Sequence, residues 1–349
     1  MSTVRAFLTL QDGTVFEGVS FGAKKSIAGE LAFTTGMTGY TESITDPSYS
    51  GQILMFTYPL IGNYGVQPKA SWESAKVHTK GIVVSAYNST QSHWSNITPL
   101  HEWLESEGIP GIQIIDTRGL TQKIRIHGAM LGKITISNDK IDFYDPNSDD
   151  LVSNVSTKKI YSEGNGKKKV VLIDCGVKRN IQRLLLSKGV TLTTVPHDTD
   201  IFDEGLDFDG ILLSNGPGDP KMNLKTIATV KKALGKKVPM LGICLGNQIL
   251  ALAAGGDTYK LKFGHRGQNH PCVMTGSKKC FLTTQNHGFA VSKMPKNFVP
   301  WFENANDGTN EGIIHKSLPF MSVQFHPEAN PGPIDTEWIF DKFLEKIRA

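Results

Sequence analysis

The sequence predicts two domains, a smaller β-rich α+β domain followed by an α/β domain with a doubly wound, mostly parallel sheet. Its 349 residues, 39% hydrophobic and 20% charged, suffice for two cores. Short strand-like runs dominate the first 136 residues, whereas strand-like and helix-like segments alternate after residue 169. Within that alternation, Cys244 stands between two glycines where a strand is expected to meet a helix.

Residues 1–136 are predicted to form the β-rich domain. Runs such as Leu31–Thr35 and Gln52–Thr57 have the composition of short strands and are bounded by turns that contain Gly or Pro. Only Pro99–Glu107 and Thr117–His127 show helical spacing of apolar residues. We expect no catalytic constellation from this domain alone.

Residues 137–168 are rich in Ser, Asn, Asp, Gly and Lys and lack apolar periodicity, so they are predicted to connect the domains. The α/β domain is expected over residues 169–349. Its predicted strands are Val170–Asp174, Val190–Val195, Gly210–Ser214 and Val238–Leu241, and its predicted helices are Asn180–Lys188, Leu224–Leu234 and Asn247–Ala254. Ligands of such sheets bind at the carboxyl ends of the parallel strands.

Cys244 is the candidate nucleophile. The run Gly242-Ile243-Cys244-Leu245-Gly246 gives the small neighbours that a strained strand-to-helix turn needs. A helix N-terminus also favours a thiolate through the helix dipole. About eighty residues later, Phe325-His326-Pro327-Glu328 supplies a base and a carboxylate that can orient it. Together Cys244, His326 and Glu328 indicate acyl transfer.

A second loop follows the predicted strand that ends at Ser214. Its sequence, Asn215-Gly216-Pro217-Gly218-Asp219-Pro220, favours a tight, rigid turn whose backbone N–H groups point into a cleft. Acyl transfer needs such donors for the developing oxyanion. The N–H groups of Gly218 and Leu245 are the candidates.

Composition excludes several function classes. A net charge of +4 and an isolated basic run, Lys167–Lys169, without aromatic neighbours argue against nucleic-acid binding. The N-terminal residues lack a long apolar run, and no stretch approaches the length of a membrane span, so a cytoplasmic protein is expected. We find no phosphate-binding loop and no Gly-x-Gly-x-x-Gly motif. His265, His270, Cys272 and Cys280 fit no usual zinc spacing, so no metal site is expected.

The three motifs together resemble those of class I (triad) glutamine amidotransferases over residues 169–349. Other segments resemble the small chains of carbamoyl-phosphate synthase. They are Met37–Tyr40, Thr45–Gln52, Asp116–Arg118, Gly264–Pro271 and Gln285–Val291.

This resemblance implies a mechanism and a set of contacts. Cys244 would attack the side-chain amide of glutamine, His326 would pass a proton to the leaving ammonia, and water would release glutamate from the thioester. The glutamine contacts implied by the family are Ser48, Gly216, Gly218, Leu245, Gln248, Asn286, Gly288 and Phe289.

The resemblance also implies what this chain lacks. Carbamoyl phosphate synthesis consumes ATP and bicarbonate, so ATP and Mg are expected on a large synthetase chain that receives the ammonia. We expect no cofactor on this chain, a hetero-oligomer such as a heterodimer, and a product used for arginine or pyrimidine synthesis.

Three alternatives remain open from the sequence. The chain could be the amidotransferase subunit of another synthase, such as anthranilate synthase, although that would not explain the leading 136 residues. It could be a cysteine peptidase or γ-glutamyl hydrolase on a similar fold. It could also be a non-catalytic regulatory scaffold, against which the intact Cys244, His326 and Glu328 argue.

Overall fold

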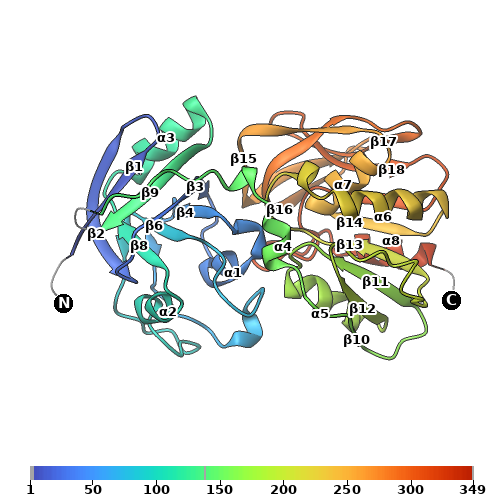
Figure 1. Cartoon of the computed structure of the whole chain (residues 1–349), viewed down its shortest axis with the longest axis horizontal. Helices are drawn as coiled ribbons and strands as arrows, with labels where there is room; N and C mark the ends of the chain where they lie inside the picture. Colours follow the sequence, from blue (N-terminus) through green and yellow to red (C-terminus); the bar gives the residue numbers. More distant parts are fainter. Residues whose placement is uncertain (1–3, 137–138, 348–349) are drawn as a thin grey trace. The chain divides into compact units, whose positions relative to one another are not determined.

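A computed structural model of the chain describes residues 4–136 and 139–347. The chain divides into two compact units, Met1–Asp149 and Asp150–Ala349 (Figure 1), and each is described by itself.

The first unit is built on a closed barrel with the strand order β1-β2-β8-β6-β4-β3-β9. The barrel strands are β1 Arg5–Leu10, β2 Val15–Gly22, β3 Ile27–Thr34, β4 Gln52–Phe56, β6 Gly81–Val84, β8 Pro110–Gln113 and β9 Met130–Ile136. The other elements are α1 Tyr40–Thr45, η1 Pro47–Tyr49, β5 Leu60–Ile61, η2 Lys69–Ser71, β7 Ala86–Tyr87, α2 Leu100–Ser106, α3 Thr117–His127 and η3 Pro146–Ser148. The β-rich first unit predicted from the sequence is therefore confirmed.

Alternation of side chains explains how these strands close a core. In β1, Ala6, Leu8 and Leu10 are fully buried, while the residues between them are partly exposed. Helix α3 begins where the Asp116 carboxylate accepts a hydrogen bond from the Gly119 amide (2.7 Å), a typical N-cap.

The second unit contains a ten-stranded sheet with the order β10-β12-β11-β13-β14-β19-β18-β17-β15-β16. Its strands are β10 Tyr161–Glu163, β11 Lys169–Asp174, β12 Thr191–Pro196, β13 Gly210–Leu213, β14 Met240–Ile243, β15 Asp257–Met274, β16 Cys280–Lys293, β17 Phe298–Asn304, β18 Asn310–His315 and β19 Phe320–Val323. Its helices are α4 Leu151–Val155, α5 Arg179–Ser187, η4 Pro220–Met222, α6 Leu224–Gly235, α7 Leu245–Ala253 and α8 Trp338–Lys346.

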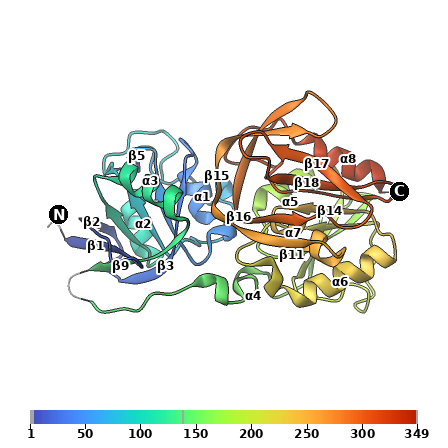
Figure 2. The same ribbon diagram turned by 90° about the horizontal axis from the view of Figure 1, so that it is seen from above.

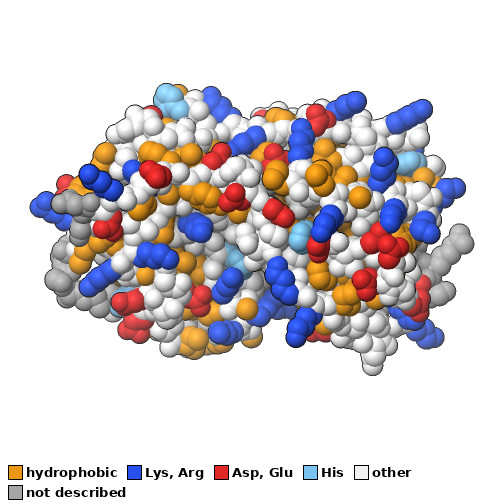
Figure 3. Space-filling view, in the orientation of Figure 1, with side chains coloured by type: hydrophobic (Ala, Val, Ile, Leu, Met, Phe, Trp, Pro, Cys, Tyr) orange, Lys and Arg blue, Asp and Glu red, His pale blue; other side chains and the backbone are white. Residues whose placement is uncertain are grey.

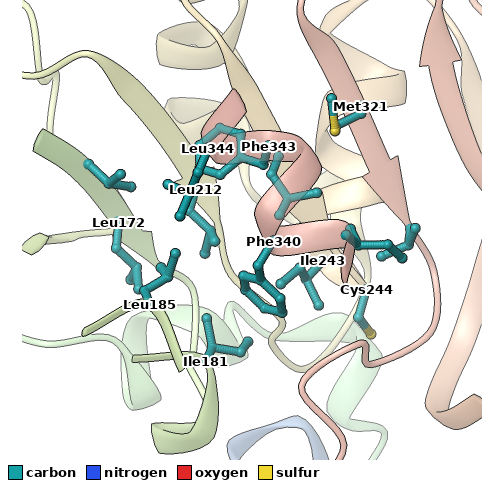
Figure 4. Packing of buried hydrophobic residues seen from close by; sticks show 14 of the residues in the cluster. Leu172, Ile181, Leu185, Leu212, Ile243, Cys244, Met321, Phe340, Phe343 and Leu344 are labelled. Carbon is teal, nitrogen blue, oxygen red and sulfur yellow. The ribbon is translucent and has the colours of Figure 1, made fainter. Parts of the chain in front are cut away.

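Five neighbouring strands, β12, β11, β13, β14 and β19, run parallel and have a hydrophobic core on each face. Along β11, Val170 and Leu172 enter the core that contains α5 and α8, while Val171 and Ile173 enter the core that contains α6 and α7. Figure 4 shows part of the first core, with Leu172, Leu212 and Phe340 packed together and the Cys244 sulfur directed away from them. Helices on both faces confirm the doubly wound α/β fold.

The antiparallel strands β18, β17, β15 and β16 extend the sheet beyond β19 (Figure 2). Periodicity does not indicate them, because the two longest, β15 and β16, carry many polar residues. The segment 137–168, predicted as a connection, contains η3, α4 and β10 among its described residues. Among the described residues, no helix combines the length and apolar character that crossing a membrane requires.

Candidate active site

The turn between β14 and α7 holds Cys244 in a strained backbone conformation. Its φ of 55° and ψ of −105° lie outside the regions that L residues favour, and it caps the N-terminus of α7. The chain can pack here only because the flanking residues are glycines. A Cβ on Gly242 would lie 2.5 Å from the Gly246 carbonyl oxygen, and one on Gly246 would lie 2.3 Å from that of Leu213. The predicted strand–nucleophile–helix turn is therefore present.

His326 and Glu328 follow β19 at the carboxyl end of the parallel strands. The His326 amide donates to the Thr284 carbonyl of β16 (2.9 Å), which fixes the histidine beside that strand. Nδ1 of His326 lies 2.7 Å from Oε1 of Glu328, and both side chains are buried. Since a carboxylate only accepts hydrogen bonds, Nδ1–H is the donor and Nε2 is left for the chemistry.

Lys178 is a third charge at this pair. Its Nζ lies 3.1 Å from the same Glu328 oxygen and donates to the Ala329 carbonyl (2.6 Å), and the lysine is itself buried. Burial alone would raise the pKa of Glu328, but the charges of Lys178 and His326 outweigh it and lower that pKa. Glu328 is thus ionised in the folded protein.

The ionised Glu328 sets the protonation of His326. Burial alone would lower the histidine pKa, but the charge of Glu328, together with interactions with Cys244, raises it above its ordinary value. His326 therefore holds a proton at neutral pH. A proton on the imidazole next to the Cys244 thiol favours a thiolate–imidazolium pair.

The structure brings four of the predicted glutamine contacts next to Cys244. The Cys244 thiol lies 3.7 Å from the backbone oxygen of Asn286, with Gly288 and Phe289 following on the same strand β16. Gln248, one turn into α7, donates its amide to the Phe289 carbonyl (2.8 Å). The thiol, an amide side chain and the polar strand segment 286–289 thus form one site.

The remaining predicted contacts fall into two groups. Gly216 lies against the nucleophile turn, because a Cβ added to it would approach Leu245 Cδ2 to 2.8 Å and the Cys175 carbonyl to 2.1 Å. Gly218 has a φ of 82°, which suits glycine. Ser48 lies in η1 of the first unit, where its amide bonds to the Asp46 carboxylate (2.9 Å), and its contact with glutamine stays a prediction.

Sequence reasoning missed two side chains of this site. Lys178 stands just before α5, and Gln324 lies two residues before His326. The Gln324 side-chain oxygen accepts from the amides of Asn247 (3.1 Å) and Gln248 (3.1 Å). The available signal was position: Lys178 follows β11 at the carboxyl edge, where ligands of parallel sheets bind.

Outside this constellation, His265, His287 and Glu311 are buried with ligand atoms within 4.8 Å of one another, a group that can hold a metal ion.

Two family models match the chain. The model described as glutamine amidotransferase class-I matches residues 171–346, and the model described as carbamoyl-phosphate synthase small chain, CPSase domain, matches residues 8–134.

Full-length relatives agree with both models. The chain is 46% identical to the carbamoyl phosphate synthase arginine-specific small chain of Saccharomyces cerevisiae, across 99% of this chain and 89% of that one. It is 47% identical to the multifunctional protein pyr1-3 of Dictyostelium discoideum, across 97% of this chain, but spans only 17% of that protein.

Among solved structures, a putative GMP synthase protein from Thermoplasma acidophilum is 26% identical. The match covers 52% of this chain and 94% of that one, with a TM-score of 0.47. The sequence relatives and both family models cover the two units and confirm the resemblance seen in the motifs: the chain belongs to the carbamoyl-phosphate synthase small chains, with a class I glutamine amidotransferase domain in its second unit.

Proposed function

We propose that this chain hydrolyses L-glutamine to glutamate and ammonia and passes the ammonia to a large synthetase chain that makes carbamoyl phosphate. The observation that carries the proposal is the buried set Cys244, His326 and Glu328. Cys244 stands at the N-terminus of α7, and His326 is oriented by the carboxylate of Glu328 at 2.7 Å. This is the arrangement of a nucleophile, an acid–base group and an orienting carboxylate.

The first half of the reaction forms a thioester. The Cys244 thiolate attacks the side-chain amide carbon of glutamine, and the electron pair moves onto the carbonyl oxygen. As the tetrahedral intermediate collapses, the C–N bond breaks and the His326 imidazolium gives its proton to the leaving nitrogen, which departs as ammonia. The raised pKa of His326 suits it to this role, because it starts with the proton in place.

The second half releases glutamate. Neutral His326 takes a proton from water, the hydroxide attacks the thioester, and the C–S bond breaks to regenerate the thiolate and the imidazolium. The backbone N–H of Leu245 and the Gly216–Gly218 loop are proposed to stabilise the oxyanion in both halves. Gln248, Asn286, Gly288, Phe289 and, from the first unit, Ser48 are proposed to bind the glutamine.

The partner follows from what the reaction requires. Carbamoyl phosphate synthesis also needs bicarbonate and ATP with Mg²⁺, which we assign to the large chain, so the working enzyme is proposed to be a hetero-oligomer. A catalytic thiol needs a reducing compartment, which supports a cytoplasmic location. Since the relatives include an arginine-specific small chain and pyr1-3, arginine and pyrimidine synthesis are the proposed uses of the product.

The charge pattern agrees with small-molecule chemistry. On the face shown in Figure 3, basic and acidic side chains are interspersed and do not form a basic tract of the kind that nucleic acid requires.

The experiment measures glutamine turnover by the purified chain alone, with its large chain, and with the large chain plus ATP and bicarbonate. Ammonia made without an acceptor is wasted, and a 1 Å misplacement of a catalytic group can cost about 100-fold. We therefore expect slow hydrolysis alone and faster hydrolysis in each fuller mixture. Equal rates in all three would contradict coupling, and cleavage of peptides in preference to glutamine would favour a peptidase.

A further inference from the structure

The second unit contains a cluster of three side chains from three different strands. His265 lies in β15, His287 in β16 and Glu311 in β18, and all three are more than nine-tenths buried. Their ligand atoms lie within 4.8 Å of one another. None of the three has a role in the proposed hydrolysis, and burying them together costs free energy unless their charges are balanced.

The outward-facing atoms of the cluster are already engaged. His265 Nε2 lies 2.9 Å from the Asp307 carboxylate, and His287 Nδ1 lies 2.9 Å from the Phe289 carbonyl. The Asn304 amide donates to Oε1 of Glu311 (2.9 Å). Metal-ligating histidines almost always donate their second N–H to a carboxylate or a backbone carbonyl, and ligating carboxylates are themselves hydrogen-bonded. This cluster has all three features.

The inward-facing atoms are left with lone pairs facing each other. Since Nδ1 of His287 donates to a carbonyl, its Nε2 carries the lone pair of the neutral ring. Two oxygens face that lone pair, Oε1 of Gln285 at 3.2 Å and Oε2 of Glu311 at 3.9 Å. Within the described part of the chain, Oε2 of Glu311 has no hydrogen-bond partner, although it is buried. A cation between these atoms would satisfy all of them.

We propose that His265 Nδ1, His287 Nε2 and Glu311 bind a divalent transition-metal ion, with Zn²⁺ the best match. Two imidazoles and one carboxylate form a donor set that zinc uses in proteins, whereas Mg²⁺ and Ca²⁺ prefer oxygen ligands alone. A fourth position is left for water or for the Gln285 oxygen. Burial and the neighbouring His265 lower the pKa of His287, so the neutral ring is ready to act as a ligand.

The ion would act as a structural clamp. His287 stands between Asn286 and Gly288 in the strand segment proposed to bind glutamine, and its ring shares the Phe289 carbonyl with Gln248. Coordination would therefore join β15, β16 and β18 behind that segment. The competing explanation is a shared proton, carried by His265 between Asp307 and Glu311, and the experiment separates the two.

The test measures metal bound by the full chain in a Cys244→Ser background, which prevents binding by the catalytic thiol. The protein is stripped with a chelator and titrated with Zn²⁺ against a competing chelator, with metal content measured by mass spectrometry. We expect one ion per chain and a rise in Tm on adding Zn²⁺. Co²⁺ should give the absorption of a site without thiolate ligands, which excludes binding at Cys272 or Cys280.

Three further variants in that background locate the site. Glu311→Gln keeps the shape but removes the charged ligand, and should weaken Zn²⁺ binding by at least about 100-fold. Asp307→Asn removes an outer partner and should cost about 10–100-fold. Glu303→Gln, an exposed carboxylate on β17, is the matched control and should change nothing.

Two results would overturn the proposal. One is that the Cys244→Ser protein binds less than a tenth of an equivalent of Zn²⁺ with no change in Tm, which would leave the shared proton as the explanation. The other is that binding is unaffected by Glu311→Gln. If Glu311→Gln does not fold, the half-exposed Asp307 allows Asp307→Asn to decide. Metal content is measured independently of glutamine hydrolysis, so it does not depend on the proposed function.

Discussion

Nζ of Lys178 lies 3.1 Å from the Glu328 oxygen that contacts His326 at 2.7 Å. A buried lysine thus keeps the carboxylate ionised, and the carboxylate keeps the histidine protonated. Lys178→Met should therefore lower kcat more than it raises KM for glutamine, because the proton on His326 would be lost.

The same variant should destabilise the fold, since removing one partner of a buried ion pair costs about 3–5 kcal/mol. Urea unfolding and steady-state kinetics measure the two effects. Lys188→Met, which removes a surface lysine paired with Asp341, is the matched control. Unchanged kinetics in Lys178→Met would contradict the relay of charge.

His326→Asn should cost far more activity than Glu328→Gln. His326 transfers protons in both halves of the reaction, which is worth about 100–10,000-fold, whereas Glu328 orients and stabilises it. Single-turnover hydrolysis measures both losses. The reverse order would show that the two roles have been assigned wrongly.

The contribution of His326 to stability should depend on pH. Its pKa is raised in the folded protein by Glu328 and Cys244 against burial, from a usual value of 6.5. The stabilisation is therefore complete below pH 6.5 and is lost as the pH rises towards the raised value, by up to about 1.4 kcal/mol per pH unit.

The measurement compares the free energy of unfolding of the wild type and His326→Gln between pH 6 and 9. The difference in favour of the wild type should shrink with rising pH. A difference that is constant, or that grows, would contradict a raised histidine pKa.

Local sequence was enough to predict the nucleophile turn. The strand, the glycines and the helix around Cys244 are neighbours in the chain, and the steric need for Gly242 and Gly246 can be seen from spacing alone. The same holds for α3, whose predicted range, Thr117–His127, is the observed one.

Contacts made by strand pairing could not be predicted in this way. Lys178 meets the backbone of Ala329 across 151 residues of chain, and only the order of β11, β14 and β19 in the sheet brings them together. The proposed metal ligands come from β15, β16 and β18, so no short spacing motif announces them, which is why the sequence predicted no metal site.

Cys244→Ser should abolish glutamine-dependent synthesis of carbamoyl phosphate by the assembled complex and leave ammonia-dependent synthesis largely intact. The reason is that Cys244 serves only the release of ammonia from glutamine. Product formation is measured with each nitrogen source, and size-exclusion chromatography checks assembly. An equal loss of both activities in an intact complex would contradict this division of labour.

The most direct test of the central claim is to trap the thioester. The chain is mixed with radiolabelled glutamine, quenched in acid during turnover and digested, and the labelled peptide is identified. We predict label on the peptide that contains Cys244, no label in Cys244→Ser, and unchanged label in the control Cys280→Ser, which removes an exposed thiol. Label that persists in Cys244→Ser, or wild-type protein that hydrolyses glutamine without becoming labelled, would contradict the account.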